Sequence, residues 1–141
     1  MTCAHAEGEP GNVIGFYALS SVVEEAKKLP GVKFFPFATT SYFPCLQLVY
    51  MAMSTPFQRQ PEEYGTQVLG EVVRIFAEVG TAIGLPAMIL TPINSDAARF
   101  YARLGFEAYE RGSRMFLPLQ TAVATIAAAA NEIEQEDMEA L

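Results

Sequence analysis

The sequence predicts a single α/β (α+β) domain whose mixed central sheet contains one parallel strand pair and is flanked by helices. The main observation is a long amphipathic pattern over 66–83, which lies between two apolar runs at 45–53 and 87–93. A strand–helix–strand order of this kind makes the two strands parallel, with a right-handed crossover. A chain of 141 residues is also the length of one domain, and such a domain buries roughly two-thirds of the surface that its unfolded chain exposes.

The start of the chain contains one clear strand and one ambiguous segment. Residues 1–11 are small, polar and rich in Gly and Pro, so we expect a flexible lead-in. Residues 12–19 are β-branched and aromatic and predict a strand, in which Gly15 marks a bulge or a close backbone approach. Residues 20–29 fit either a continuing strand or a helical turn. We favour the strand, followed by a loop at Pro30–Gly31.

The middle of the chain alternates between irregular and regular segments. Residues 32–44 are aromatic and interrupted by prolines, which favours an irregular, partly buried connection. Residues 45–53 (CLQLVYMAM) are almost continuously apolar and indicate a central strand. A polar connection over 54–65 precedes the helix at 66–83, and a Gly-Leu-Pro sequence ends that helix.

The second half supplies a buried strand, a capped helix and a closing hairpin. Residues 87–93 form an unbroken apolar run, which is typical of a strand covered on both faces. The helix predicted over 95–104 has Ser95 as a capping residue type and Asp96 in its first turn. Beyond it we expect two antiparallel strands and then a peripheral helix that frays towards its end, over 106–109, 113–117 and 120–141.

Charge and cysteine content exclude several classes of protein. Five of the sixteen acidic residues lie in the last eleven positions, and the formal net charge is -7, so charge does not support nucleic-acid binding. Cys3 and Cys45 are far apart and have no second pair at metal-ligand spacing, so we predict free thiols in a reducing compartment and no metal. No apolar run reaches membrane-spanning length and no signal pattern opens the chain, so we expect a cytoplasmic protein.

One motif carries a family resemblance. The segment Asn94-x-x-Ala97-x-x-Phe100-Tyr101-x-x-x-Gly105-Phe106 resembles the N-x-x-A-x-x-F-Y-x-x-x-G-F segment of the GNAT acyltransferase superfamily. VIGFYAL at 13–19 and MFLPL at 115–119 also look like strands of that family. The chain is most similar to the small members that act as toxins in toxin–antitoxin pairs. The resemblance covers 12–119 as a GNAT-like domain and leaves out the tail at 120–141.

The resemblance implies acetyl-CoA as donor and an amine as acceptor, with direct attack on the thioester in a ternary complex. Tyr101 would be the general acid that protonates the departing CoA thiolate. Asn94 and Ala97 would contact the cofactor. Backbone groups of Met51, Ala52 and Met53 would pair with the pantetheine amides and offer an N–H to the thioester oxygen. From the residues alone, Tyr101 is equally well read as a core side chain, and Asn94 as a helix cap. No general base is identifiable.

The family's pyrophosphate loop reads Q/R-x-x-G-x-G/A before its long helix. Here the best register runs from Gln60 to Gly65, so Glu63 stands at the first glycine position. Pro61 removes a backbone donor, the adjacent glutamates bring two carboxylates near an anion, and a neighbouring arginine could offset part of that charge. The implied phosphate-binding residues are Arg59, Gln60, Tyr64, Gly65 and Thr66.

Family members also carry a first strand and two helices before the strand at 13–19, and we expect these to be absent. Three functions therefore stay open: an N-acyltransferase, a GNAT-fold binding protein without catalysis, and an interaction subunit. A homodimer or a protein partner could use the sheet edge or the C-terminal helix. The acceptor is not identified, and a tRNA acceptor is compatible with the family but is not supported by charge.

Overall fold

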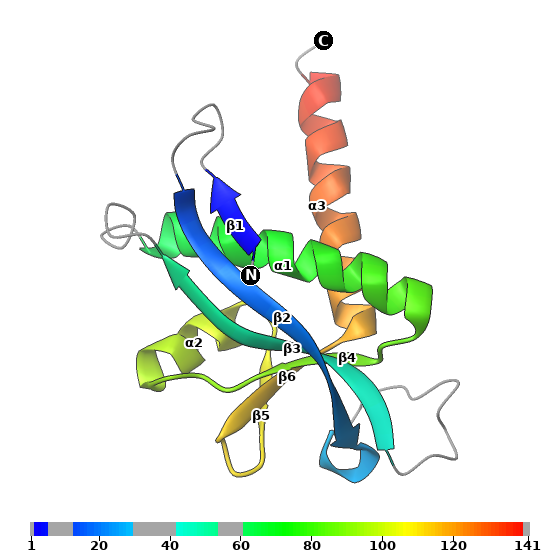
Figure 1. The fold of residues 1–141 in the computed structure, drawn as a ribbon. Coiled ribbons are helices and arrows are strands. Elements are labelled where there is room, and N and C mark those ends of the chain that lie inside the picture. The colour runs from blue at the N-terminus through cyan, green and yellow to red at the C-terminus, as the bar shows by residue number, and fades with distance from the viewer. Residues whose placement is uncertain (1, 6–12, 30–41, 54–60, 140–141) are drawn as a thin grey trace.

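A computed structural model describes residues 2–5, 13–29, 42–53 and 61–139, and shows six strands, three α-helices and one 3₁₀ helix in that part of the chain (Figure 1). In chain order the elements are β1 (Thr2–His5), β2 (Val13–Glu25), η1 (Ala26–Lys28), β3 (Tyr42–Met53), α1 (Pro61–Ile83), β4 (Ala87–Leu90), α2 (Ser95–Arg103), β5 (Glu107–Tyr109), β6 (Arg114–Pro118) and α3 (Leu119–Glu139).

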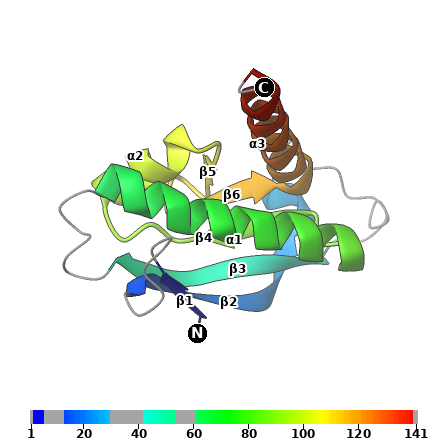
Figure 2. The same ribbon diagram turned by 90° about the horizontal axis from the view of Figure 1, so that it is seen from above.

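The strands form one mixed sheet in the order β1-β2-β3-β4-β6-β5. β3 and β4 are parallel and are joined through α1, whereas the other neighbouring strands pair antiparallel. Figure 2 shows α1 lying alongside β3 and β4. The predicted fold class, with its parallel pair and connecting helix, is therefore confirmed.

Two hydrophobic clusters lie on the two faces of the sheet. All four residues of β4 are buried, which confirms a strand covered on both faces. Met88 and Leu90 point into the main cluster, to which α1, α2 and α3 all contribute. Ala87 and Ile89 point into the second cluster, which they share with Leu29, Phe43, Cys45, Tyr109 and Phe116. Burial raises the pKa of the Cys45 thiol to about 12, so this free cysteine is a core residue and not a thiolate nucleophile.

The N-terminal part differs from the prediction. Thr2–His5 form β1, which pairs with β2, so a strand stands where we predicted a flexible lead-in and no element before residue 13. A four-residue edge strand depends on pairing with its neighbour, here β2, and the composition of the segment itself does not reveal it. The ambiguous segment at 20–29 continues β2 to Glu25 and then turns through η1. Residues 6–11 and 30–31 lie outside the described residues.

Three further boundaries differ. β3 begins at Tyr42, so 42–44 belong to the strand and not to the irregular connection, whose residues 32–41 lie outside the described part. β4 ends at Leu90, three residues earlier than predicted. The closing hairpin turns at Glu110, Arg111 and Gly112, which have positive φ of 51°, 59° and 87°. The tail forms α3, as predicted, and its first turns pack against α1.

Gly15 sits where two strands approach closely. It pairs with Met53 of β3, and a Cβ atom at this position would lie 2.4 Å from the carbonyl oxygen of Ala52. Because backbone cannot yield as a side chain end can, Gly15→Ala is expected to destabilise the protein by roughly 1–3 kcal/mol in urea unfolding. Gly70→Ala is the control, because a Cβ at position 70 meets nothing within 4 Å. Since the substitution also replaces a glycine in the middle of a helix, it is expected to raise the unfolding free energy by about 0.5–1 kcal/mol. If Gly15→Ala is as stable as the unmodified protein, β2 and β3 can move apart at Gly15 enough to accommodate a Cβ atom.

Candidate functional site

The parallel strands part at one end of the sheet. Their pairing stops at Leu48 and Leu90, where β4 ends, while β3 runs on to Met53. A β-bulge lies at the same place, because Leu48 pairs with Leu19 and Tyr50 with Ala18, which leaves Val49 unmatched. From Val49 onward no described strand pairs with β3 on the side of β4, so peptide N–H and C=O groups there are open to a ligand.

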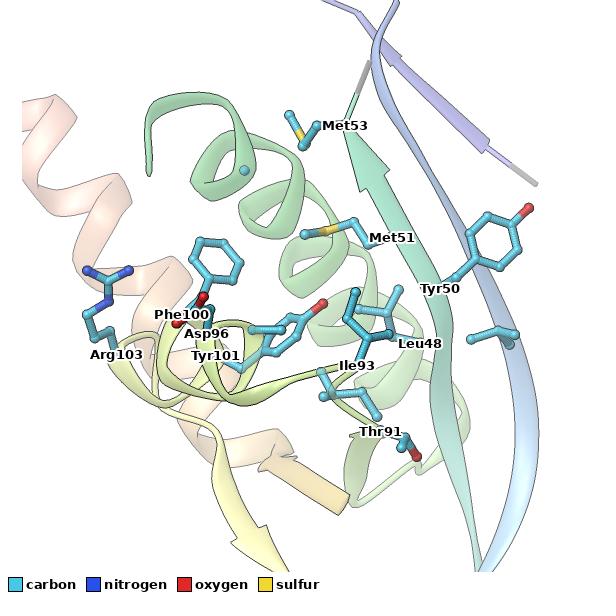
Figure 3. A pocket seen from close by; sticks show the side chains of 14 residues that line it. Leu48, Tyr50, Met51, Met53, Thr91, Ile93, Asp96, Phe100, Tyr101 and Arg103 are labelled. Atoms are coloured by element: carbon cyan, nitrogen blue, oxygen red, sulfur yellow. The ribbon is translucent and has the colours of Figure 1, made fainter. Parts of the chain in front are cut away.

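A cleft of about 480 Å³ occupies this opening, bounded by β3, the segment after β4, α2 and one position of α1 (Figure 3). Its wall is mostly apolar, with a few polar groups, as is usual for sites that bind small molecules. The lining residues are Leu48, Val49, Tyr50, Met51, Met53, Gly65, Leu90, Thr91, Ile93, Asp96, Ala97, Phe100, Tyr101 and Arg103.

Tyr101 places a hydroxyl at the inner end of the cleft. Its ring is 9% exposed and makes edge-to-face contacts with Phe100 and Phe106, at centroid distances of 5.4 and 5.5 Å. Figure 3 shows the hydroxyl directed towards Met51 and Leu48, and no group among the described residues hydrogen-bonds it. Burial raises the pKa of Tyr101, so the hydroxyl keeps its proton at neutral pH. The ring is a core side chain, and the hydroxyl is a proton donor facing the cleft.

Asn94 is the N-cap of α2. Its Oδ1 accepts a hydrogen bond from the Ala97 amide at 2.8 Å, and the side chain is exposed and does not line the cleft. The capping interpretation is therefore confirmed, with Asn94 and not Ser95 in that position. Ala97 does line the cleft. Cofactor contact by Asn94 and Ala97 stays a prediction.

Met51 and Met53 line the cleft, whereas Ala52 between them is exposed and does not. This follows from strand geometry, because successive side chains point to opposite faces. The proposed pairing with pantetheine uses backbone groups and so does not depend on that alternation. The bulge at Val49, which periodicity in the sequence could not reveal, adds an unmatched peptide group at the same edge.

The polar connection predicted over 54–65 ends earlier than expected, because α1 begins at Pro61, and phosphate binding by residues 60–65 stays a prediction. Proline is favoured at the first helical position, where its missing N–H is not needed. Gly65 therefore lies in the helix; it lines the cleft, and a Cβ there would stand 3.4 Å from the Phe100 ring. Arg59 and Gln60 lie outside the described residues.

The two neighbours of Gly65 do not line the cleft, and cofactor contact by them stays a prediction. Tyr64 is half-buried and packs against the main core without lining the cleft. Thr66 is exposed and lines a separate hollow of about 210 Å³ beside Phe100 and Arg103. Of the five predicted phosphate-binding residues, Gly65 is thus the one that the described structure brings to the cleft.

The charged side chains that line the cleft are Asp96 and Arg103 of α2. Asp96 forms an ion pair with Arg99 in which both side chains are exposed, so water screens their charges. Sequence reasoning did not single out Asp96, Arg103 or Ile93 as site residues, and Ile93 is 90% exposed at the rim. Because residues 87–93 are almost uniformly apolar, the sequence did not indicate that the last three of them lie beyond the end of β4. No cluster of metal-ligating side chains occurs in the described part of the chain.

Solved structures of KacT and AtaT have a similar fold. A Y145F mutant of KacT matches with a TM-score of 0.67 and 24% identity, over 79% of this chain and 65% of that one. AtaT complexed with acetyl-methionyl-tRNAfMet matches with a TM-score of 0.71 and 20% identity, over 88% of this chain and 72% of that one. The chain therefore has the same fold as KacT and AtaT.

Other solved structures match with similar TM-scores and sequence identities. A further bacterial toxin matches with a TM-score of 0.70 and 21% identity, over 83% of this chain and 66% of that one. AtaT has also been solved with acetyl-CoA and the C-terminus of its antitoxin AtaR. At these identities the likeness concerns the fold, and the chain spans about 65% of the KacT length. No protein-family profile and no curated protein matches the sequence.

None of the described helices combines the length and apolar character that a membrane crossing requires.

Proposed function

We propose that this protein transfers an acetyl group from acetyl-CoA to a primary amine. The observation that carries the proposal is the position of the Tyr101 hydroxyl in a cleft beside the open edge of β3. A thioester donor presents amides along its pantetheine arm and a poor thiolate leaving group at its end. The open peptide groups of β3 match the first feature, and the Tyr101 hydroxyl matches the second. AtaT, which shares the fold, has been solved with acetyl-CoA.

In this reaction the protein would position the acetyl-CoA donor and protonate the leaving sulfur. Peptide groups of Met51–Met53 would align the donor arm, and an N–H near the bulge at Val49 would stabilise the negative oxygen that develops when the neutral amine attacks. The C–N bond forms, the C–S bond breaks, and Tyr101 gives its proton to the leaving sulfur. The surplus proton of the amine passes to water, from which the tyrosinate recovers a proton.

We favour a small amine over aminoacyl-tRNA as acceptor, although AtaT has been solved with acetyl-methionyl-tRNAfMet. The chain carries a formal charge of -7, which gives no general attraction for RNA phosphates. Acetylation assays with a panel of small amines and with charged tRNA test this choice. Acetylation of tRNA alone, with rates that fall steeply as salt rises, would reverse it.

Calorimetric titration with acetyl-CoA is the primary test, and we expect micromolar binding. Gly65→Glu is expected to weaken it at least tenfold, because the new side chain would extend beside Phe100 at the cleft and bring a carboxylate near the donor's phosphates. Gly70→Glu is the matched control, since it adds the same charge to the same helix where a Cβ meets nothing within 4 Å. Equal effects of the two substitutions, or no binding at all, would refute the site.

The second candidate is a binding protein without catalysis. It is favoured by the helical conformation of residues 61–65, where the family pattern calls for a glycine-rich loop. Micromolar acetyl-CoA binding with no acetyl transfer to any amine in the panel, and no effect of Tyr101→Phe on any measured property, would establish it.

A further inference from the structure

The C-terminal helix α3 carries an apolar stripe that continues beyond the body of the protein. Leu119, Ile126 and Ile133 follow at seven-residue intervals, with Ala122 and Ala129 between them, which is the spacing of a helix that packs against another helix. Leu119 and Ile126 pack on the main core and Ala122 is fully buried. Ile133 is 59% exposed, and residues 127–139 are all exposed. Figure 1 shows this half of α3 projecting past α1.

The same half of the helix is acidic and contains no basic residue. Glu132 and Glu139 flank the stripe on one side and Asp137 flanks it on the other, at the positions that set partner choice in paired helices. Acidic side chains at a helix C-terminus oppose the helix dipole and weaken the helix. This outer half therefore combines an exposed Ile133 with charges that a cationic partner would neutralise, and nothing among the described residues supplies that partner.

We propose that the outer half of α3, residues 127–139, is a docking surface for a basic amphipathic helix of another protein. The apolar seam of that helix would pack on Ala129 and Ile133, and its Lys or Arg side chains would face Glu132, Asp137 and Glu139 beside the stripe and Glu136, which follows Ala129 on the stripe itself. A second copy of this chain does not fit. Because α3 has no Lys, Arg or His, pairing two copies in either direction would set acid against acid. The proposal stands independently of the acetyl-transfer reaction.

The test is a titration of the full chain with a synthetic three-heptad peptide that has Leu or Ile at the seam and Lys at the flanking positions. We expect micromolar binding that weakens as salt rises. Ile133→Ser is expected to weaken it about tenfold or more. Met138→Ser is the matched control: Met138 is 74% exposed on the same helix but lies off the stripe, so binding should change less than twofold.

Charge reversal supplies a reciprocal test. The double variant Glu132→Lys/Glu139→Lys should no longer bind the peptide with Lys at the flanking positions. It should instead bind a peptide with Glu at those positions, which we expect the unmodified chain not to bind. Circular dichroism and urea unfolding of every variant show that the domain is folded.

Three results would overturn the proposal. One is equal binding of a scrambled peptide of the same composition, which would indicate charge attraction alone. Another is Lys-peptide binding that Ile133→Ser leaves unchanged. The third is a stable dimer in sedimentation at neutral pH that Ile133→Ser dissociates, which would make a second copy the occupant.

Discussion

Replacing Tyr101 by Phe is expected to lower kcat for acetyl transfer roughly 100- to 10,000-fold and to leave the Kd for acetyl-CoA nearly unchanged. The substitution retains the ring that packs against Phe100 and Phe106 and removes only the hydroxyl at the cleft. Without that proton the sulfur must leave as an unprotonated thiolate. Release of free CoA with a small amine as acceptor measures the rate, and calorimetry measures the binding.

The pH dependence of the same reaction gives an independent test. Burial raises the pKa of Tyr101 above its ordinary value of 10.0, so the donor stays protonated through neutral and moderately alkaline pH. We expect the alkaline limb of kcat to lie above pH 10 and to disappear in Tyr101→Phe. Tyr42→Phe is the control, because Tyr42 is exposed and lies outside the cleft. An undiminished kcat in Tyr101→Phe would remove the hydroxyl from the mechanism.

Replacing Glu24 by Ala is expected to cost roughly 3 kcal/mol of unfolding free energy, the largest stability effect that we predict for a single side chain. Glu24 is 4% exposed at the end of β2, and its carboxylate accepts hydrogen bonds from Tyr109 and Arg114, both at 2.9 Å. Removing it leaves a buried hydroxyl and a partly buried guanidinium without their acceptor. The cost lies at the lower end of its range because the Arg114 side chain is 26% exposed and can reach water.

Urea unfolding measures this loss of unfolding free energy, and two further variants separate its causes. Glu24→Gln keeps an acceptor for Tyr109 but loses the charge opposite Arg114, so its loss should be intermediate. Glu110→Ala removes the carboxylate that pairs with Lys28 at 2.6 Å near the surface, and its loss should be much smaller. Glu24 belongs to β2, and Tyr109 and Arg114 belong to β5 and β6. If Glu24→Ala unfolds at the same urea concentration as the unmodified protein, the hydrogen bonds from Tyr109 and Arg114 to Glu24 do not stabilise the contact between the β5–β6 hairpin and β2.

Several features could be predicted because their signals are local. The periodicity over 66–83 predicted α1, and the strand–helix–strand order predicted the parallel pairing of β3 and β4. The short helix with its cap was also predicted, although Asn94 and not Ser95 occupies the capping position. Within the motif segment, Ala97, Phe100 and Tyr101 all lie at the cleft. Helix spacing brings such residues to one face without help from distant contacts.

Other features depend on residues far apart in the chain. The burial of Glu24 requires Tyr109 and Arg114, which lie 85 and 90 positions away. The start of α1 at Pro61 moved Gly65 from an expected loop into a helix that faces Phe100.

Sequence by itself determined most strands and helices of this protein, β1 excepted, and how the central ones connect, because hydrophobic periodicity and capping act over a few residues. Only the tertiary structure decided where β3 and β4 part, which side chains line the opening, and that Ile133 of α3 is left uncovered. Those outcomes depend on how far each strand and helix extends beyond its neighbour, and packing between distant segments sets that distance.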